Sequence, residues 1–194
     1  MHASMDKLAP LTSDKGGIWF HPFGNWTGQD TSGNGQQVGF AAKTGGLIAG
    51  ADYRVHQNVF LGAGLGYTVT SIDMDLNAGH NKVRDLFLNL YGTWFKDNFY
   101  IDGALLAGYQ KYKTTRNLIS GTTTTAANST HNGYSLVPHA EIGYTFSLPI
   151  VDLTPYASGD YITIHEKGYT ERNGGAGASS INKRTSTLFR SEFG

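Results

Sequence analysis

Cysteine is absent from the 194-residue chain, and charged residues are scarce. Without cysteine the protein has no disulfides, no thiolate chemistry and no cysteine-based metal site. Charged residues make up 15% of the chain, against roughly 25% in average soluble proteins. The formal net charge is zero, so no nucleic-acid partner is expected. No run approaches the ~20 apolar residues of a transmembrane helix. Membrane β-strands remain open, because alternating strands average to neutral hydropathy.

Apolar side chains instead recur at every second position. From Val59 to Thr68, the odd positions carry Val, Leu, Ala, Leu and Tyr, and the even positions carry mostly Gly and Thr. Period two places successive side chains on opposite faces of a strand. One face is therefore apolar and the other small or polar, which is typical of a strand between lipid and a lumen.

Eight strands are expected, at residues 17–27, 40–56, 59–73, 82–96, 99–114, 133–148, 152–165 and 184–194. Each reaches the ~9–11 residues that a tilted transmembrane strand needs. Tight turns are expected at 56–58, 96–98 and 149–151, and long polar loops near 28–39, 74–81, 115–132 and 166–183. Short periplasmic turns and long extracellular loops are typical of outer-membrane barrels. The chain is therefore predicted to be all-β, an antiparallel up-and-down transmembrane β-barrel.

Strand parity predicts which side chains face lipid. The expected lipid-facing residues are Leu47, Ala49, Ala51, Tyr53, Leu61, Ala63, Leu65, Tyr67, Leu86, Leu88, Leu90, Trp94, Ile101, Leu105, Tyr109, Leu136, Ala140, Ile142, Tyr144 and Phe146. Aromatic residues gather near the strand ends, as interfacial girdles do. The first strand, around Ile18 to Phe23, is apolar on both faces and its orientation is left open.

In nearly every strand, charged and polar residues fall on the opposite, lumen-facing parity. We expect a lumenal polar network made of Asp52, Arg54, Asp85, Asp102, His139, Glu141, Asp160, Arg190 and Glu192. A charge on the lipid face costs about 2–4 kcal/mol at mid-bilayer, which favours this partition. Buried charges need partners wherever they occur, so structural polarity accounts for the network without any catalysis.

The order of short motifs along the chain resembles the autotransporter β-domain, the translocator of type V secretion. The resemblance covers residues 17–194. It rests on Gly17-Ile18-Trp19, Gly50-Ala51-Asp52-Tyr53-Arg54, Leu90-Tyr91-Gly92-Thr93-Trp94, Tyr100-Ile101-Asp102-Gly103, Glu141-Ile142-Gly143-Tyr144, Thr154-Pro155-Tyr156-Ala157 and Leu188-Phe189-Arg190-Ser191-Glu192-Phe193-Gly194.

This resemblance implies a 12-stranded outer-membrane barrel of a Gram-negative-type bacterium, with a helical linker in the lumen and an exported passenger. The chain is expected to hold about eight of those strands, the N-terminal two-thirds of the barrel at residues 17–194. Residues 1–16 are expected to be a leader or linker remnant, with the export signal outside the printed residues or an artificial start. Eight strands must close on themselves, recruit further strands or stay out of the membrane, because an open edge in lipid is costly.

The expected function is a non-enzymatic translocator or anchor that helps export or display a passenger absent from these residues. The expected partners are outer-membrane lipid, that passenger or linker polypeptide and the barrel-assembly machinery, with the chain as a monomer. The alternative is a stand-alone small barrel, an adhesin or narrow porin that acts through its long loops. A soluble β-sandwich that binds a ligand is a third possibility.

No catalytic, cofactor-binding or metal-binding residue is predicted. His80 and His131 fall in expected loops as solvated residues, and no histidine pair has helical metal-ligand spacing. His139 lies two residues from Glu141 on the same expected face, which predicts a lumenal hydrogen bond between them. Gly62 to Tyr67 lies inside a strand and opens no helix, so it is no phosphate loop.

Overall fold

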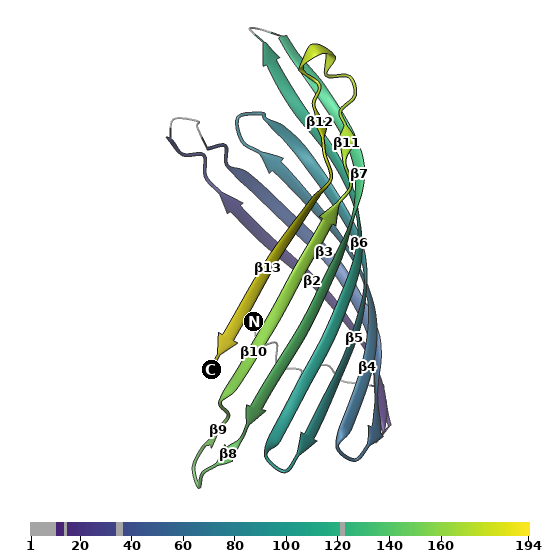
Figure 1. Ribbon diagram of the computed structural model, residues 1–194, viewed down its shortest axis with the longest axis vertical. Coiled ribbons are helices and arrows are strands. Elements are labelled where there is room, and N and C mark those ends of the chain that lie inside the picture. The colour runs from purple at the N-terminus through teal and green to yellow at the C-terminus, as the bar shows by residue number, and fades with distance from the viewer. Residues whose placement is uncertain (1–10, 14, 34–36, 121–122) are drawn as a thin grey trace.

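One antiparallel sheet dominates the fold. The computed structural model describes residues 11–13, 15–33, 37–120 and 123–194. Figure 1 shows a twisted, curved layer with tight turns at one end and the longer connections at the other. The nine strands of the sheet follow one another in chain order, apart from the short strands outside it. They are β1 (Leu11–Ser13), β2 (Gly16–Gln29), β3 (Phe40–His56), β4 (Val59–Met74), β5 (Gly79–Lys96), β6 (Phe99–Ser120), β7 (Thr123–Tyr144), β10 (Tyr156–Glu166) and β13 (Arg184–Phe193).

Two small hairpins lie outside the main sheet. At the tight-turn end, β8 (Phe146–Ser147) pairs with β9 (Asp152–Leu153). At the opposite end, β11 (Tyr169–Thr170) pairs with β12 (Ser180–Ile181), and the 3-10 turn η3 (Gly175–Gly177) lies between them. Among the described residues, no helix has the length and apolarity needed to cross a membrane.

The all-β, up-and-down prediction is confirmed, and each of its eight ranges overlaps one of the eight long strands. The expected loop at 115–132 is wrong, because β6 and β7 run on to Ser120 and from Thr123 in continuous pairing. The segment is rich in Thr, Ser and Gly, a composition that is also typical of loops. Threonine is β-branched and favours strands, so the segment extends the sheet. The expected tight turn at 149–151 lies at the tip of the small β8–β9 hairpin, where Leu148 N donates to Val151 O at 3.0 Å. The strands of the main sheet stop short of it, since β7 ends at Tyr144 and β10 begins at Tyr156.

The expected truncation after eight strands is not supported by the strand count. The described residues form thirteen strand segments, eight of which have ten residues or more. The expected leader at 1–16 lies mostly outside the described residues, and its described part includes β1, which pairs with the start of β2. The boundary at residue 16 therefore stays a prediction.

Inward aromatic side chains lie opposite glycines on the neighbouring strand. The register pairs Trp19 with Gly50, Tyr91 with Gly62, Phe87 with Gly66 and Tyr100 with Gly143. A Cβ atom built on any of these four glycines would overlap the ring of the aromatic residue opposite. Glycine at these positions therefore allows each large ring to pack flat against the sheet. Any side chain in place of the glycine would push the ring away from the sheet.

Adding a methyl group at Gly66 should destabilise the folded protein by about 2 kcal/mol, because overpacking forces the buried Phe87 ring from its place. The measurement is the free energy of unfolding in urea, from detergent micelles, for Gly66→Ala. The matched control is Gly45→Ala, since a Cβ at Gly45 meets no atom within 4 Å. That control should be unchanged or gain up to about 1 kcal/mol. Equal values for the two variants would contradict the packing argument.

Candidate functional site

One side-chain contact between strands that are not neighbours distinguishes the two faces of the sheet. Trp19 Nε1 on β2 donates a hydrogen bond to Tyr91 Oη on β5 at 2.8 Å. Strands β3 and β4 lie between β2 and β5. A side-chain contact over two intervening strands forms on the concave face, so this face is the inside. Trp19 also orients the first strand, which the sequence left open: Ile18 and Phe20 lie exposed on the outside.

Three of the predicted lumenal residues meet on neighbouring strands. His139 on β7, Asp160 on β10 and Arg190 on β13 are directly opposite in register. Asp160 Oδ1 lies 2.8 Å from His139 Nδ1, and Asp160 Oδ2 accepts a hydrogen bond from Arg190 Nε at 2.9 Å. Asp160 is buried. The hydrogen bonds from these two donors offset the free-energy cost of removing the Asp160 carboxylate from water.

The other predicted lumenal residues contact mainly aromatic or amide side chains. Hydrogen bonds run from Tyr91 Oη to Asp52 at 3.3 Å, Tyr100 Oη to Glu141 at 2.8 Å, Tyr156 Oη to Glu192 at 2.7 Å and Gln110 Nε2 to Asp85 at 3.0 Å. The Arg54 guanidinium lies 4.5 Å from the Phe60 ring centre. Asp102 Oδ1 is buried and has no hydrogen-bond partner among the described residues.

The expected pair of His139 with Glu141 is wrong. Residues i and i+2 on one strand lie roughly 7 Å apart, whereas directly opposite residues on adjacent strands lie about 5 Å apart. His139 therefore reaches Asp160 across the strand pair, while Glu141 accepts from Tyr100.

The two histidines expected in loops lie instead in strands. His80, in β5, has its Nδ1 2.6 Å from Asp73 Oδ1. His131, in β7, is 6% exposed and lies between two rings, with ring centres 4.7 Å from Tyr112 and 4.1 Å from Tyr169. The sequence concealed this stack because β11, which carries Tyr169, folds back from a polar loop.

The loop between β10 and β13 is clamped onto the extended β6–β7 hairpin. Arg116 donates two hydrogen bonds to Glu171, at 3.0 and 2.6 Å, and Ser179 N donates to the same carboxylate at 2.9 Å. Asn128 and Arg172 exchange backbone hydrogen bonds at 2.8 Å, which continues the pairing of β7 beyond β10. The hydrogen bonds from Arg116 hold the pKa of Glu171 below its usual value. No spacing in the sequence marked this clamp.

The outward face carries an apolar band between two aromatic belts. Tyr67, Tyr109 and Tyr134 form a row at the long-loop side, where the rings of Tyr109 and Tyr134 are 5.4 Å apart. At the tight-turn side, Trp94 and Phe99 rings are 6.0 Å apart and Tyr144 and Phe146 rings 4.7 Å apart. Ten residue steps lie between Phe99 and Tyr109 on β6. With a rise of about 3.4 Å and a tilt of about 40°, they span roughly 25 Å, which matches the apolar band of membrane barrels.

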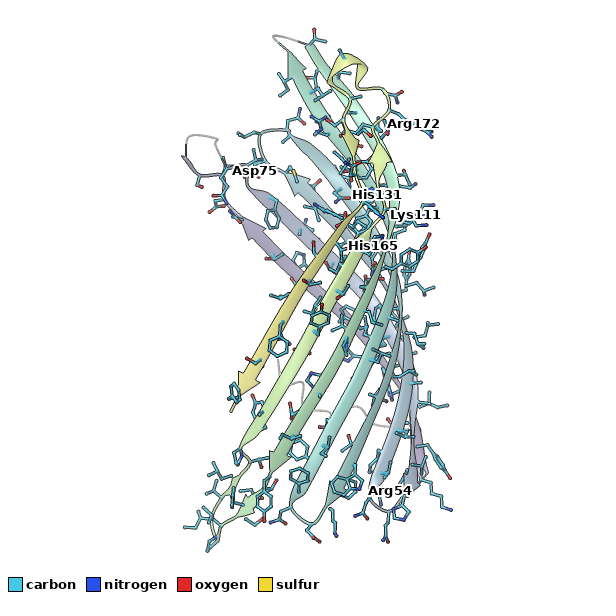
Figure 2. All side chains as sticks on the ribbon, viewed as in Figure 1. Arg54, Asp75, Lys111, His131, His165 and Arg172 are labelled. Carbon is cyan, nitrogen blue, oxygen red and sulfur yellow. The ribbon has the colours of Figure 1, made fainter. Side chains whose placement is uncertain are left out.

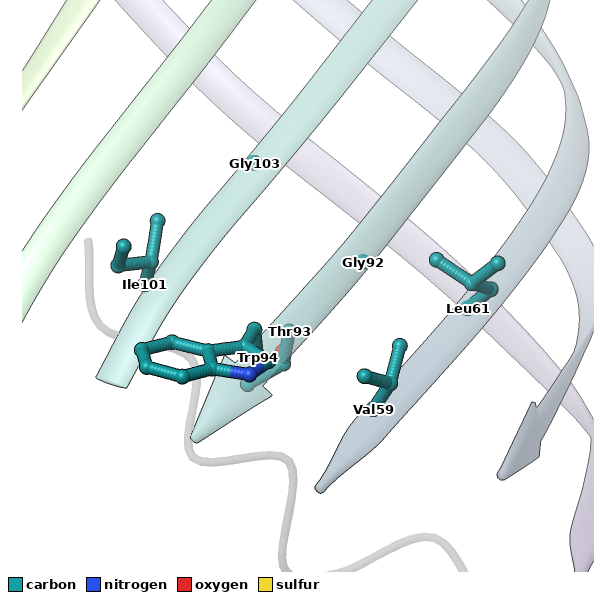
Figure 3. A pocket seen from close by; sticks show the side chains of 7 residues that line it. All are labelled: Val59, Leu61, Gly92, Thr93, Trp94, Ile101 and Gly103. Atoms are coloured by element: carbon teal, nitrogen blue, oxygen red, sulfur yellow. The ribbon is translucent and has the colours of Figure 1, made fainter. Parts of the chain in front are cut away.

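A shallow apolar hollow lies within this band, near the tight-turn belt (Figure 3). It has a volume of about 360 Å³ and is lined by Val59, Leu61, Gly92, Thr93, Trp94, Ile101 and Gly103. The register pairs Gly92 with Gly103, so no side chain fills the sheet between Leu61 and Ile101. Because the hollow is apolar and lies on the outward face, it suits contact with acyl chains rather than with water.

A sheet with an apolar, aromatic-belted outside and a polar inside defines an outer-membrane β-barrel protein. The model of the autotransporter β-domain family matches residues 18–194. The chain belongs to the autotransporter β-domain family, and it is an outer-membrane translocator domain of Gram-negative bacteria.

Curated relatives are much longer than this chain. An extracellular serine protease of Serratia marcescens is 29% identical over 189 residues, which is 95% of this chain and 17% of the relative. Outer membrane protein B of Rickettsia japonica is 27% identical over 182 residues, 89% of this chain and 11% of the relative. The probable autotransporter YpjA of Escherichia coli K12 is 31% identical over 141 residues, 71% of this chain and 9% of the relative. The chain thus spans less than a fifth of these proteins.

Two solved structures share the fold. The translocator domain of the autotransporter NalP from Neisseria meningitidis superposes with a TM-score of 0.70 at 19% identity, covering 90% of this chain and 57% of that one. The β-domain of the Bordetella autotransporter BrkA superposes with a TM-score of 0.63 at 24% identity, covering 92% of this chain and 68% of that one.

Glu171→Gln should loosen the segment 167–183 from β6 and β7. Loss of the charge-assisted hydrogen bonds from Arg116 costs about 2 kcal/mol, so amide exchange at 169–181 should accelerate roughly 30-fold. The matched control is Glu192→Gln, which loses a carboxylate at the opposite end of β13.

Acid should also accelerate amide exchange at 169–181 in the wild-type protein. Because the folded-state pKa of Glu171 is lowered, its contribution is complete at neutral pH and is lost as the pH falls through that lowered pKa. If exchange at 169–181 is unchanged in Glu171→Gln, or equally fast in Glu192→Gln, the clamp does not hold the loop.

Proposed function

We propose that this chain acts as a non-enzymatic translocator and membrane anchor, and that it helps export or display a passenger polypeptide outside the 194 residues. Membership of the autotransporter β-domain family supports the proposal most directly. The relatives in which this region makes up less than a fifth of the length support it further. The Serratia marcescens relative is named an extracellular serine protease, and in our proposal such an activity belongs to a passenger rather than to this region.

The inward face suits a hydrated passage. The nine predicted polar residues form, in this proposal, a lumenal network that a transported chain passes, with His139, Asp160 and Arg190 at its most tightly paired part. Asp102 and Gln110 each carry a buried oxygen without a hydrogen-bond partner among the described residues. Such oxygens are acceptors that water or a passing backbone N–H can satisfy.

The two edges of the sheet need partners in lipid. Within the described residues, β13 pairs with β10 alone, and β2 pairs with β3 and briefly with β1. Unpaired backbone groups cost several kcal/mol each in hydrocarbon, so the membrane-embedded form pairs these edges with each other or with further strands. The barrel-assembly machinery is the proposed partner for this step, and the inserted barrel is proposed to be a monomer.

A reporter passenger fused ahead of residue 1 tests translocation in intact Gram-negative cells. The reporter should become accessible to protease added outside the cells. Ala104→Trp places a bulky group on the inward face of β6 and should reduce that accessibility at equal amounts of inserted protein, because the lumen narrows.

The matched control is Ala107→Trp on the outward face of the same strand, which should display the reporter normally. A reporter that stays periplasmic behind a correctly inserted wild-type chain would overturn the proposed function.

A further inference from the structure

A cluster of positive charge lies on the outward face, just beyond the tyrosine belt at the long-loop side. The row next to the belt carries Arg84 on β5, Lys111 on β6 and, past Asn132, Lys167 after β10. The following row carries Lys43 on β3, Lys82 on β5 and Lys113 on β6. We call these six residues the outer cationic patch. Figure 2 shows Lys111 in the long-loop half, with Arg54 at the tight-turn end.

Like charges stand directly opposite each other within this patch. The register pairs Arg84 with Lys111 and Lys82 with Lys113. Directly opposite like charges on adjacent strands destabilise a sheet. Ion pairs within the described part of the chain do not relieve the repulsion, because none of them involves these six residues. Asp73, one row further out, already contacts His80 at 2.6 Å.

The position of the patch points to the lipid headgroups. Lys111 follows Tyr109 by two residues, so it lies about 5 Å further from the membrane centre, where phosphates are found. Lys167 Nζ lies 5.4 Å from the centre of the Tyr134 ring, which ties the patch to the belt. On the membrane side of the tyrosine belt, the outward faces of these strands are apolar. A single lipid can therefore contact this apolar surface with its acyl chains and the cations with its headgroup.

The distance between the opposed cation pairs indicates how many phosphates the bound headgroup carries. The two opposed pairs are one row apart, roughly 7 Å along the strands. Lysine is a compact point charge that binds phosphate, and arginine adds planar donors. We propose that the outer cationic patch binds an anionic lipid of the outer leaflet whose headgroup carries two phosphates. The repulsion within the bare sheet is then relieved by the lipid, which makes the patch a specific lipid site on the barrel wall.

The test uses the full chain refolded in a neutral maltoside detergent and fluorescently labelled lipid A, a bisphosphorylated glycolipid. Anisotropy titration gives the dissociation constant. Each cation near an anionic headgroup contributes about fivefold to binding, so Arg84→Gln/Lys111→Gln should weaken binding roughly 25-fold. Arg54→Gln/Lys96→Gln removes two charges at the tight-turn end and should stay within about twofold of the wild type. Arg84→Lys/Lys111→Arg keeps both charges and should restore binding.

Further readouts separate a lipid site from a structural role and from free anions. Heat-modifiable gel mobility confirms that each variant is folded before titration. Without lipid, Arg84→Gln/Lys111→Gln should unfold at the same or a higher temperature than the wild type, because repulsion is removed. Lipid A should raise the unfolding temperature of the wild type, of Arg54→Gln/Lys96→Gln and of Arg84→Lys/Lys111→Arg, but should have little effect on that of Arg84→Gln/Lys111→Gln. The proposal is overturned if both double Gln variants bind equally, if dephosphorylated lipid A binds as tightly, or if inorganic pyrophosphate at equal concentration displaces the lipid.

Discussion

The hydrogen bonding of the backbone in hydrocarbon is the constraint on which this structure depends. Where no water reaches the chain, each N–H and C=O needs a partner, and strands obtain one only from neighbouring strands. The long strands therefore pair over most of their length, and the β6–β7 hairpin is paired from Phe99 and Tyr144 at one end to Ser120 and Thr123 at the other. Strand pairing in turn imposes period two, which separates a lipid face from a lumen face.

That separation decides where each kind of side chain lies. Outside, leucines and alanines form a band that ends at tyrosine and tryptophan belts, and lysines follow where headgroups begin. Inside, glycines such as Gly50 and Gly66 make room for rings that lie flat across the sheet. Charges remain inside where a partner is opposite, as Asp160 shows between His139 and Arg190.

Most of the fold could be predicted from the sequence, because period two is a local signal. Leu86, Leu88 and Leu90 mark the outside of β5 without knowledge of any other strand. Contacts between strands depend on the register, which the sequence does not show. The partner of His139 was therefore predicted wrongly, and the orientation of Trp19 could not be predicted. The loop clamp of Arg116 with Glu171 joins residues 55 positions apart through a polar segment without periodicity, and no local pattern marks it.

Water accessibility of alternate positions on one strand tests the account most directly. The chain lacks cysteine, so single substitutions report one site at a time. The protein is refolded into lipid vesicles and treated with a membrane-impermeant maleimide from both sides. We expect labelling at the inward positions of β5 in Asp85→Cys and Asn89→Cys, and protection at the outward positions in Leu86→Cys, Leu88→Cys and Leu90→Cys. Equal labelling at neighbouring positions would contradict a strand between lipid and lumen.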